Sequence, residues 1–278
     1  MEVTATGPIN LHLTLMDSGQ CFQWVEREGW FCAAPGGMPC RIRMEGEVLQ
    51  TAEGDETFLR RYLDIDADYA ALSRDDDPIL QACIRRFPGL RLLAQPVWET
   101  LLMFILSANN NVARIRKLTL SLAARFGQRF SGPFGDVYAL PTPAALAEAG
   151  EDALRELGAG YRAPYLVNTA RRVLEGFPLD LLRDLPYPQA HARLKELPGV
   201  GDKVADCVLL FGCGHREAFP TDVWVARVLG QWYGMYGRDR RILARMARER
   251  FGKDAGLKQQ FLFHAARTEG MEFPFHKN

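Results

Sequence analysis

The chain lacks the cysteine spacing of a metal centre or of a disulfide scaffold. Its 6 cysteines include no C-x-x-C pair and are spread from Cys21 to Cys213. Four metal ligands would be more closely spaced, and a secreted disulfide scaffold would be shorter and richer in cysteine. We therefore expect reduced thiols, no metal site and a reducing compartment.

Segments that direct a chain to a membrane are also missing. The N-terminus has no basic stretch followed by an apolar one, which a signal peptide requires. The longest apolar run, Leu101–Leu106, is far shorter than the ~20 residues that cross a bilayer as a helix. These features predict a soluble cytoplasmic protein with no membrane partner.

The chain has no excess of either charge. Its 278 residues contain 34 Lys plus Arg and 34 Asp plus Glu. A net charge of zero excludes a protein that coats nucleic acid through bulk charge, but it is compatible with a local basic face. Residues 1–100 contain 9 basic and 16 acidic side chains, so the basic excess lies in the remaining two-thirds. Lysine is scarce, because 28 of the basic residues are Arg.

Hydrophobic periodicity divides the chain into a β-containing N-terminal domain, residues 1–94, and a helical domain, residues 95–278. Apolar and polar residues alternate over Ile9–Leu15 and over Arg41–Met44, which predicts strands of a small antiparallel sheet. From Pro78 the period becomes helical, with a wide apolar stripe over residues 98–106. Further helices are predicted over residues 118–126, 141–157, 164–174, 188–197 and 202–211. The predicted fold class is α+β, mainly α.

The most informative segment is L-P-G-V-G-D-K-V-A-D-C at residues 197–207, inside a helical hairpin predicted for residues 188–211. Gly199 and Gly201 permit positive φ and leave the amides of the turn, including that of Val200, uncovered by side chains. Together with the following helix N-terminus, these amides predict a phosphate-binding nest. A plain helical hairpin is the alternative. Carbonyl groups are exposed at such a turn too, which is compatible with a structural cation there.

Lys203, one turn into the second helix of the hairpin, is the candidate nucleophile. This chain uses Arg where it needs only positive charge, yet it has Lys here. A desolvated lysine can lose its proton and attack carbon, which arginine effectively cannot. The alternative is a solvated surface lysine without a role.

Asp222 follows nineteen residues later, at the start of a helix whose predicted apolar face is Val225, Val228 and Leu229. Thr221 or Asp222 is expected to cap this helix. A carboxylate fixed at a helix N-terminus stays ionised and oriented, so capping and catalysis are compatible.

The hairpin motif, followed by P-T-D-V at residues 220–223, resembles the helix-hairpin-helix–Gly/Pro–Asp (HhH-GPD) superfamily of DNA base-excision glycosylases. Four other segments resemble the 8-oxoguanine DNA glycosylase family within it. They are S-G-Q-C-F-Q-W at 18–24, S-A-N-N-N-V-A-R at 107–114, L-G-A-G-Y-R-A at 157–163 and Q-Q-F-L-F at 259–263. All appear in the family's order over nearly the whole chain. The resemblance implies an N-terminal sheet domain followed by an all-α body in two helical lobes, and a nucleoid location in a bacterium.

The resemblance also implies a bifunctional enzyme that acts on damaged double-stranded DNA. Lys203 would attack the sugar C1′ of the damaged nucleotide and form a Schiff base, and β-elimination would then nick the strand as an AP lyase does. Asp222 would stabilise the positive charge that develops on the deoxyribose. The substrate would be 8-oxoguanine, and also formamidopyrimidine-guanine, opposite cytosine.

The damaged base would be flipped from the duplex into a pocket. By resemblance it would lie between Cys207 and Phe263, with Gln259 on its Watson–Crick edge. The Gly19 carbonyl would accept the N7 hydrogen that distinguishes 8-oxoguanine from guanine. Taken alone, Cys207 and Phe263 are more often core residues, and Gly19 is more often part of a turn.

Four residues match the family's contacts with the opposite strand. Tyr161 would wedge the duplex, Asn109 would enter the vacated gap, and Arg114 and Arg162 would donate to the unpaired cytosine. A helix cap is the alternative for Asn109. We expect no cofactor and no iron–sulfur cluster, because no cysteine follows Phe263. A monomer suits an enzyme that must grip and bend a duplex.

Two features depart from this pattern or leave it open. Trp224 stands where the family in higher organisms has a histidine, so the corresponding phosphate contact is not implied. The segment Arg238–Lys253, with 7 basic and 2 acidic residues, is compatible with a DNA-facing stripe and with a solvated helix face. The alternative functions are an alkylated-base glycosylase, which lacks the lysine and activates water, and a non-catalytic helix-hairpin-helix DNA-binding protein.

Overall fold

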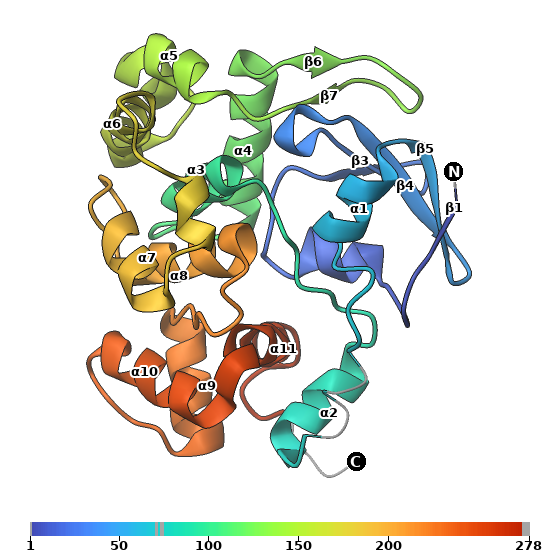
Figure 1. Ribbon diagram of the computed structural model, residues 1–278, viewed down its shortest axis with the longest axis vertical. Helices are drawn as coiled ribbons and strands as arrows, with labels where there is room; N and C mark the ends of the chain where they lie inside the picture. Colours follow the sequence, from blue (N-terminus) through green and yellow to red (C-terminus); the bar gives the residue numbers. More distant parts are fainter. Residues whose placement is uncertain (1, 70–71, 73–74, 274–278) are drawn as a thin grey trace.

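The computed structural model describes residues 2–69, 72 and 75–273, and it places a small sheet beside a larger helical body (Figure 1). The sheet is antiparallel, with the strand order β1–β5–β4–β3–β2. The strands are β1 (Glu2–Thr4), β2 (Val25–Arg27), β3 (Trp30–Ala33), β4 (Cys40–Glu45) and β5 (Val48–Glu53). The prediction of a strand over Arg41–Met44 is therefore confirmed. Helix α1 (Glu56–Tyr62) lies across the sheet, with its capping carboxylate supplied by Asp55.

The predicted strand over Ile9–Leu15 is wrong, because this segment enters a wide π-helical turn, His12–Asp17. The two oxygens of Asn10 accept the first hydrogen bonds of this turn. The side-chain oxygen accepts from the Leu13 amide at 2.9 Å, and the backbone carbonyl accepts from the Thr14 amide at 2.9 Å. The alternation misled the prediction because Thr14, although polar, is buried beside the backbone of Gly89, to which its hydroxyl donates.

The helices of the body form two groups, as the predicted fold class requires. One group packs around α3, and the other contains the last three helices together with α2. The first group is α3 (Val97–Leu106), α4 (Val112–Phe126), α5 (Pro143–Glu156), α6 (Ala163–Leu174), α7 (Tyr187–Leu194) and α8 (Asp202–Val208). The second is α2 (Pro78–Arg86), α9 (Val223–Tyr233), α10 (Arg240–Phe251) and α11 (Ala255–Glu269). The predicted class, an antiparallel sheet followed by a mainly helical body, is confirmed.

A short hairpin of two strands, β6 (Arg129–Phe130) and β7 (Val137–Tyr138), interrupts the helical body between α4 and α5. Its turn reaches the N-terminal sheet, where the ring of Phe134 stacks on Trp30 with 4.9 Å between centroids. Arg27 donates to the carbonyl of Phe134 at 2.9 Å. Strands of two residues have no periodicity to detect, so the sequence did not reveal this link between the domains.

Helix α3 is the centre of the molecule and positions the site at its C-terminal end. It is buried along nearly its whole length, which explains why its apolar stripe is so wide. Helix α8 packs on α3 and continues into a wide π-helical turn, Leu209–Cys213, as the predicted helix over 202–211 anticipated. The rings of Phe104 and Phe211 stack between the two helices at 5.5 Å. The residues that follow α3 are thereby fixed against the helix that carries Lys203.

Candidate active site

The hairpin between α7 and α8 is built around two glycines with different requirements. Gly199 has a φ of +79°, and a Cβ at this position would lie 2.8 Å from Tyr165, so only glycine fits. Gly201 has extended backbone at the N-cap of α8, and no atom lies within 4 Å of the place that its Cβ would take. The side chain of Val200 is buried between them. The hairpin is formed as predicted, and whether it binds phosphate stays a prediction.

The amine of Lys203 is held by groups from α3. Its Nζ donates to the Ser107 hydroxyl at 3.0 Å and lies 4.8 Å from the centroid of the Phe104 ring. Within the described part of the chain, no carboxylate lies within 4.0 Å of this Nζ. The amine is therefore oriented by a neutral hydroxyl and an aromatic face, and not by an ion pair.

Cys207 lies one turn after Lys203 on α8. Burial raises the pKa of its thiol to about 12, although the nearby Lys203 amine acts in the opposite direction. The thiol is thus protonated and uncharged at neutral pH. It is a polarisable, neutral group that lies close to the amine.

Asp222 caps α9, because its carboxylate accepts a hydrogen bond from the Val225 amide at 2.9 Å. The predicted capping role and the predicted apolar face are confirmed, since Val225, Val228 and Leu229 are buried. The cap fixes one carboxylate oxygen on the backbone. It places Asp222 on the wall of the same cleft as Lys203.

This cleft has a volume of about 1040 Å³ and lies between the two helical groups. It is large enough to receive a nucleotide base and its sugar. Seven of the predicted site residues line it: Gly19, Asn109, Gly199, Gly201, Lys203, Asp222 and Phe263. The structure thus brings together residues from the N-terminal domain and from four separate segments of the helical body.

Two of the predicted base contacts are not on the surface of the cleft. Cys207 is buried in α8, and Gln259 is buried on α11. The Gln259 amide nitrogen donates to the Pro220 carbonyl at 3.3 Å, and its oxygen accepts from Gln260 at 2.7 Å. Gln259 would have to exchange these partners to bond with a base.

The residues predicted to contact the opposite strand meet around the loop that follows α3. Asn109 is exposed there with a φ of +47°, a left-handed conformation that asparagine adopts more readily than most non-glycine residues. Tyr161 is exposed, and its hydroxyl donates to the Ala108 carbonyl at 3.0 Å. Arg114 is exposed and donates to the Gly158 carbonyl at 3.2 Å.

Arg162 differs from its neighbours because only 3% of it is exposed. Its guanidinium donates to the carbonyls of Ala108 and Asn109, the latter at 2.9 Å, and lies 4.4 Å from the centroid of the Tyr161 ring. The donors of Arg162 thus hold the loop of Asn109 in place.

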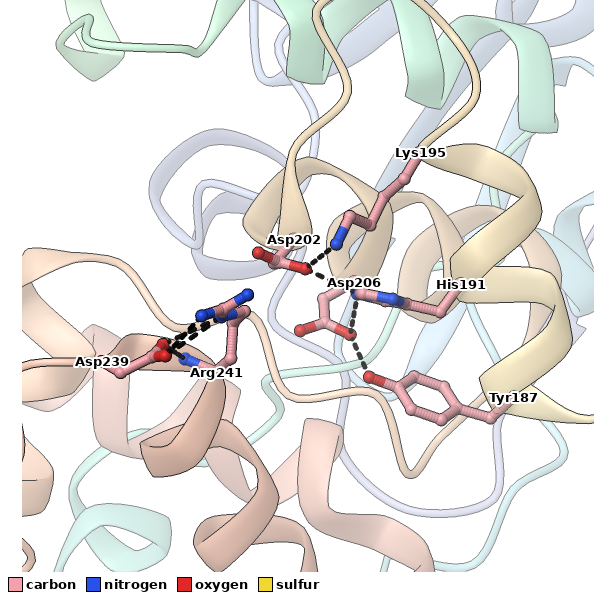
Figure 2. A network of polar contacts seen from close by, with 7 residues as sticks. All are labelled: Tyr187, His191, Lys195, Asp202, Asp206, Asp239 and Arg241. Atoms are coloured by element: carbon pink, nitrogen blue, oxygen red, sulfur yellow. Dashed lines mark hydrogen bonds and ion pairs between the residues drawn. The ribbon is translucent and has the colours of Figure 1, made fainter.

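A polar network lies behind the hairpin, and the sequence did not indicate it (Figure 2). Asp206 is buried on α8 and accepts a hydrogen bond from the Tyr187 hydroxyl at 2.6 Å, with His191 at 3.8 Å. Burial raises the pKa of Asp206. Near the surface, Asp202 pairs with Lys195 at 2.6 Å. These contacts tie α8 to α7 and hold the hairpin together from inside.

The basic segment Arg238–Lys253 forms α10 and its flanks, and only its beginning reaches the cleft. Asp239, Arg240 and Arg241 line the cleft, with Arg241 paired to Asp239 at 2.6 Å (Figure 2). Further along, Arg250 pairs with Asp77 at 3.6 Å on the other side of the molecule. A DNA-facing role thus remains a prediction for the first turn of α10.

Among the cleft residues that the sequence did not single out are Phe104, Ser107 and Arg267. Ser107 belongs to a recognised motif, but its bond to Lys203 depends on the packing of α3 against α8. The signal for Arg267 is its position on α11, four residues after Phe263. Trp224 also lines the cleft, where Arg227 lies 5.5 Å from the centroid of its ring.

The described part of the chain offers neither a cluster of metal ligands nor a helix that could span a membrane. Over residues 2–69, 72 and 75–273, no group of three or more His, Cys, Asp or Glu side chains is placed to hold a metal ion. The 6 cysteines are free and buried. No helix among these residues is long and apolar enough to cross a bilayer.

Two family models match consecutive parts of the chain. The N-terminal domain of 8-oxoguanine DNA glycosylase matches residues 3–101, and the HhH-GPD superfamily of base excision DNA repair proteins matches residues 102–253. The chain belongs to the 8-oxoguanine DNA glycosylase family. It is a DNA N-glycosylase with AP lyase activity, as its motifs predicted.

Individual relatives agree with this assignment. The chain is 31% identical to a probable N-glycosylase/DNA lyase of Methanothermobacter thermautotrophicus, over 95% of this chain and 96% of that protein. It is 35% identical to the N-glycosylase/DNA lyase of Saccharomyces cerevisiae, but it spans only 56% of that protein's length. Among solved structures, the chain resembles the Clostridium acetobutylicum 8-oxoguanine glycosylase/lyase in complex with double-stranded DNA that contains cytosine opposite 8-oxoguanine. That match has a TM-score of 0.89 and 30% identity, and it covers 98% of this chain and 99% of the other.

The scaffold is shared more widely than the family. A 3-methyladenine DNA glycosylase from Archaeoglobus fulgidus has a TM-score of 0.80 to this chain, over 98% of its length, at 21% identity. At this identity the likeness extends to the fold alone. The shared fold therefore does not distinguish between substrates, and the substrate must be inferred from the side chains that line the cleft.

Proposed function

We propose that this enzyme removes 8-oxoguanine from duplex DNA opposite cytosine, accepts formamidopyrimidine-guanine as well, and nicks the strand through a Schiff base on Lys203. The observation that carries the proposal is the placement of Lys203 and Asp222 on one cleft, with the amine oriented by Ser107. Binding of phosphates alone requires neither residue. An alkylated-base glycosylase that activates water would not need the lysine.

The chemistry begins when Lys203, as a neutral amine, attacks C1′ of the flipped nucleotide. The Nζ–C1′ bond forms as the glycosidic bond breaks, and the base leaves with the electron pair and takes up a proton. Asp222, fixed by its cap on α9, stabilises the positive charge on the sugar in this transition state. Opening of the sugar ring then gives the Schiff base. Loss of a C2′ proton expels the 3′ phosphate and nicks the strand.

The damaged base is proposed to lie between Cys207 and Phe263. Phe263 and Gly19 both line the cleft, and Cys207 is a neutral thiol because burial raises its pKa. A neutral thiol and an aromatic ring suit the two faces of an uncharged base. The Gly19 carbonyl accepts the N7 hydrogen of 8-oxoguanine, and Gln259 exchanges its bonds to Pro220 and Gln260 for the Watson–Crick edge.

The opposite strand is proposed to meet the loop after α3. Tyr161 and Asn109 are exposed there and enter the duplex, and the exposed Arg114 donates to cytosine. Arg162 joins Arg114 in reading cytosine only if it gives up its bonds to the carbonyls of Ala108 and Asn109. The glycosylase/lyase of known structure that was captured with cytosine opposite 8-oxoguanine supports this choice of opposite base.

Base release under single-turnover conditions tests the proposal. The substrates are duplexes with 8-oxoguanine opposite each of the four bases, with formamidopyrimidine-guanine opposite cytosine, and with 3-methyladenine opposite thymine. We expect release to be fastest for the two oxidised guanines opposite cytosine. Equal rates opposite all four bases would contradict the reading roles of Arg114 and Arg162. Release of 3-methyladenine in preference to 8-oxoguanine would contradict the proposed substrate.

A further inference from the structure

Arg267 is a cation on the wall of the cleft that none of the proposed steps uses. It lies on α11 eight residues after Gln259 and four after Phe263. Residues at this spacing share one face of a helix, so the three side chains form a row along α11. Phe263 and Arg267 line the cleft, and Gln259 is buried. The rise of 1.5 Å per residue puts about 12 Å between the first and last members of the row.

The guanidinium of Arg267 lies beside Gly19. A Cβ built on Gly19 would be 3.6 Å from its Nη1 and 3.5 Å from the Phe263 ring. The guanidinium carbon is 5.5 Å from the centroid of that ring. Arg267 therefore lies close to Phe263, which is proposed to stack on the flipped base, and to Gly19, which is proposed to accept its N7 hydrogen. Gln259 is at the other end of the row.

This guanidinium has no hydrogen-bond or ion-pair partner among the residues that the structure describes, and it is only partly exposed. Burial lowers its pKa, while Asp17 and Asp222 act in the opposite direction without forming a bond to it. The five donors of this guanidinium are not used by the described protein groups, so they are available to a ligand that enters the cleft.

We propose that Arg267 is a specificity residue that donates to the C8 carbonyl oxygen of the flipped base, so that the enzyme selects purines oxidised at C8. This inference rests on the proposed function. In 8-oxoguanine, the C8 carbonyl and the N7 hydrogen are neighbours, and they match the neighbouring Arg267 donor and Gly19 acceptor. Undamaged guanine has a C8 hydrogen and an N7 lone pair. Undamaged guanine would therefore give the Arg267 guanidinium no acceptor at C8, and its N7 lone pair would face the lone pairs of the Gly19 carbonyl oxygen.

The O6 and N7 atoms of guanine are the other acceptors that arginine commonly binds. A contact of that kind would favour undamaged guanine and oppose the selection of the lesion. The two contacts differ in their consequences for 8-oxoadenine, which keeps the C8 carbonyl and the N7 hydrogen but has no oxygen at C6.

The test compares Arg267→Gln and Arg267→Lys with Arg125→Gln, which removes an exposed arginine paired with Glu156 on the surface. We expect Arg267→Gln to slow the release of 8-oxoguanine by about 10- to 100-fold, the effect of losing a charged hydrogen bond. Arg267→Lys should recover part of the rate. Nicking of a preformed abasic site needs Lys203 but no base, so it should be unchanged in all three variants.

Binding provides a second measurement that does not depend on turnover. In the Lys203→Gln background, Arg267→Gln should weaken the affinity for 8-oxoguanine:cytosine and 8-oxoadenine:cytosine duplexes by a similar factor, and leave guanine:cytosine unchanged. The inference is overturned if Arg267→Gln releases 8-oxoguanine at the wild-type rate, if abasic-site nicking slows equally, or if 8-oxoadenine binding is spared. Failure of the wild-type enzyme to release 8-oxoguanine would instead refute the proposed function.

Discussion

Arg162 illustrates how a residue can match a recognition motif and still have a structural task. Its guanidinium is buried and satisfies carbonyls of the loop that carries Asn109. That loop includes Asn109 in a left-handed backbone conformation, which asparagine adopts more readily than most other residues. The sequence motif identifies the position of Arg162, but only the folded chain shows what its donors bind in the absence of DNA.

Replacement of Arg162 should therefore reduce stability without DNA. Arg162→Ala removes a buried guanidinium that donates to the carbonyls of Ala108 and Asn109, and we expect the free energy of unfolding to fall by about 3 kcal/mol. Arg114→Ala removes an exposed side chain and should change it by less than about 0.5 kcal/mol. Urea denaturation of the free protein measures both values. Equal losses in the two variants would contradict the structural role of Arg162.

Glu99 is a buried carboxyl in α3 whose ionisation opposes folding. Burial raises its pKa to about 7, although it accepts hydrogen bonds from Gln23 at 3.0 Å and from the Gly36 amide at 2.8 Å. The pKa of Glu99 is thus higher in the folded state than in the unfolded chain, so the protonated carboxyl favours folding. This contribution to the free energy of unfolding is complete below the unfolded-state pKa and is lost as the pH rises through about 7. Between pH 6 and pH 8 this amounts to a loss of ~1.4 kcal/mol.

Glu99→Gln should remove that part of the pH dependence. The new amide can donate to the side-chain oxygen of Gln23, which is buried without a partner among the described residues. We expect the variant to be more stable than the wild type at pH 8 by a margin that shrinks at pH 6. The measurement is urea denaturation at both pH values, and an identical pH dependence in the two proteins would rule out Glu99 as its source.

At the scale of elements, the hairpin depends on one of its two glycines for folding. Gly199→Ala forces a Cβ into the Tyr165 ring at a positive φ, and we expect it to lower the free energy of unfolding by about 2 kcal/mol or more. Gly201→Ala is the matched control, because its Cβ meets open space at an ordinary φ. Thermal or urea unfolding of both variants checks this. A Gly201→Ala variant as unstable as Gly199→Ala would show that the turn is held differently.

The elements that could be predicted from the sequence are those with local signals. The cap at Asp222, the apolar face of α9 and the glycine turn before α8 depend on residues a few positions apart. The turn after Asn10 could not be predicted, because its polar Thr14 is buried by contacts with Gly89, far along the chain. Strands β6 and β7 are too short to show a hydrophobic periodicity in the sequence. The turn between them is held by the stacking of Phe134 on Trp30 of the N-terminal domain.

At the scale of the whole molecule, the chain assembles one cleft from segments far apart in sequence. Lys203 and Asp222 could be paired from the sequence because family motifs hold them nineteen residues apart. The contact of Ser107 with Lys203 and the position of Arg267 beside Gly19 could not, since both depend on how helices pack. The zero net charge likewise hides an acidic first third and a basic remainder, which supplies most of the residues proposed to meet DNA.

The central claim is that the amine of Lys203 forms the covalent link to DNA. Borohydride reduction in the presence of an 8-oxoguanine:cytosine duplex should trap a protein–DNA complex with the wild type and with Lys258→Gln, a control lysine that pairs with Asp75 at 2.6 Å. Asp222→Asn should trap more slowly, because it weakens charge stabilisation in the transition state. Lys203→Gln should trap nothing, and a complex that survives this substitution would contradict the account.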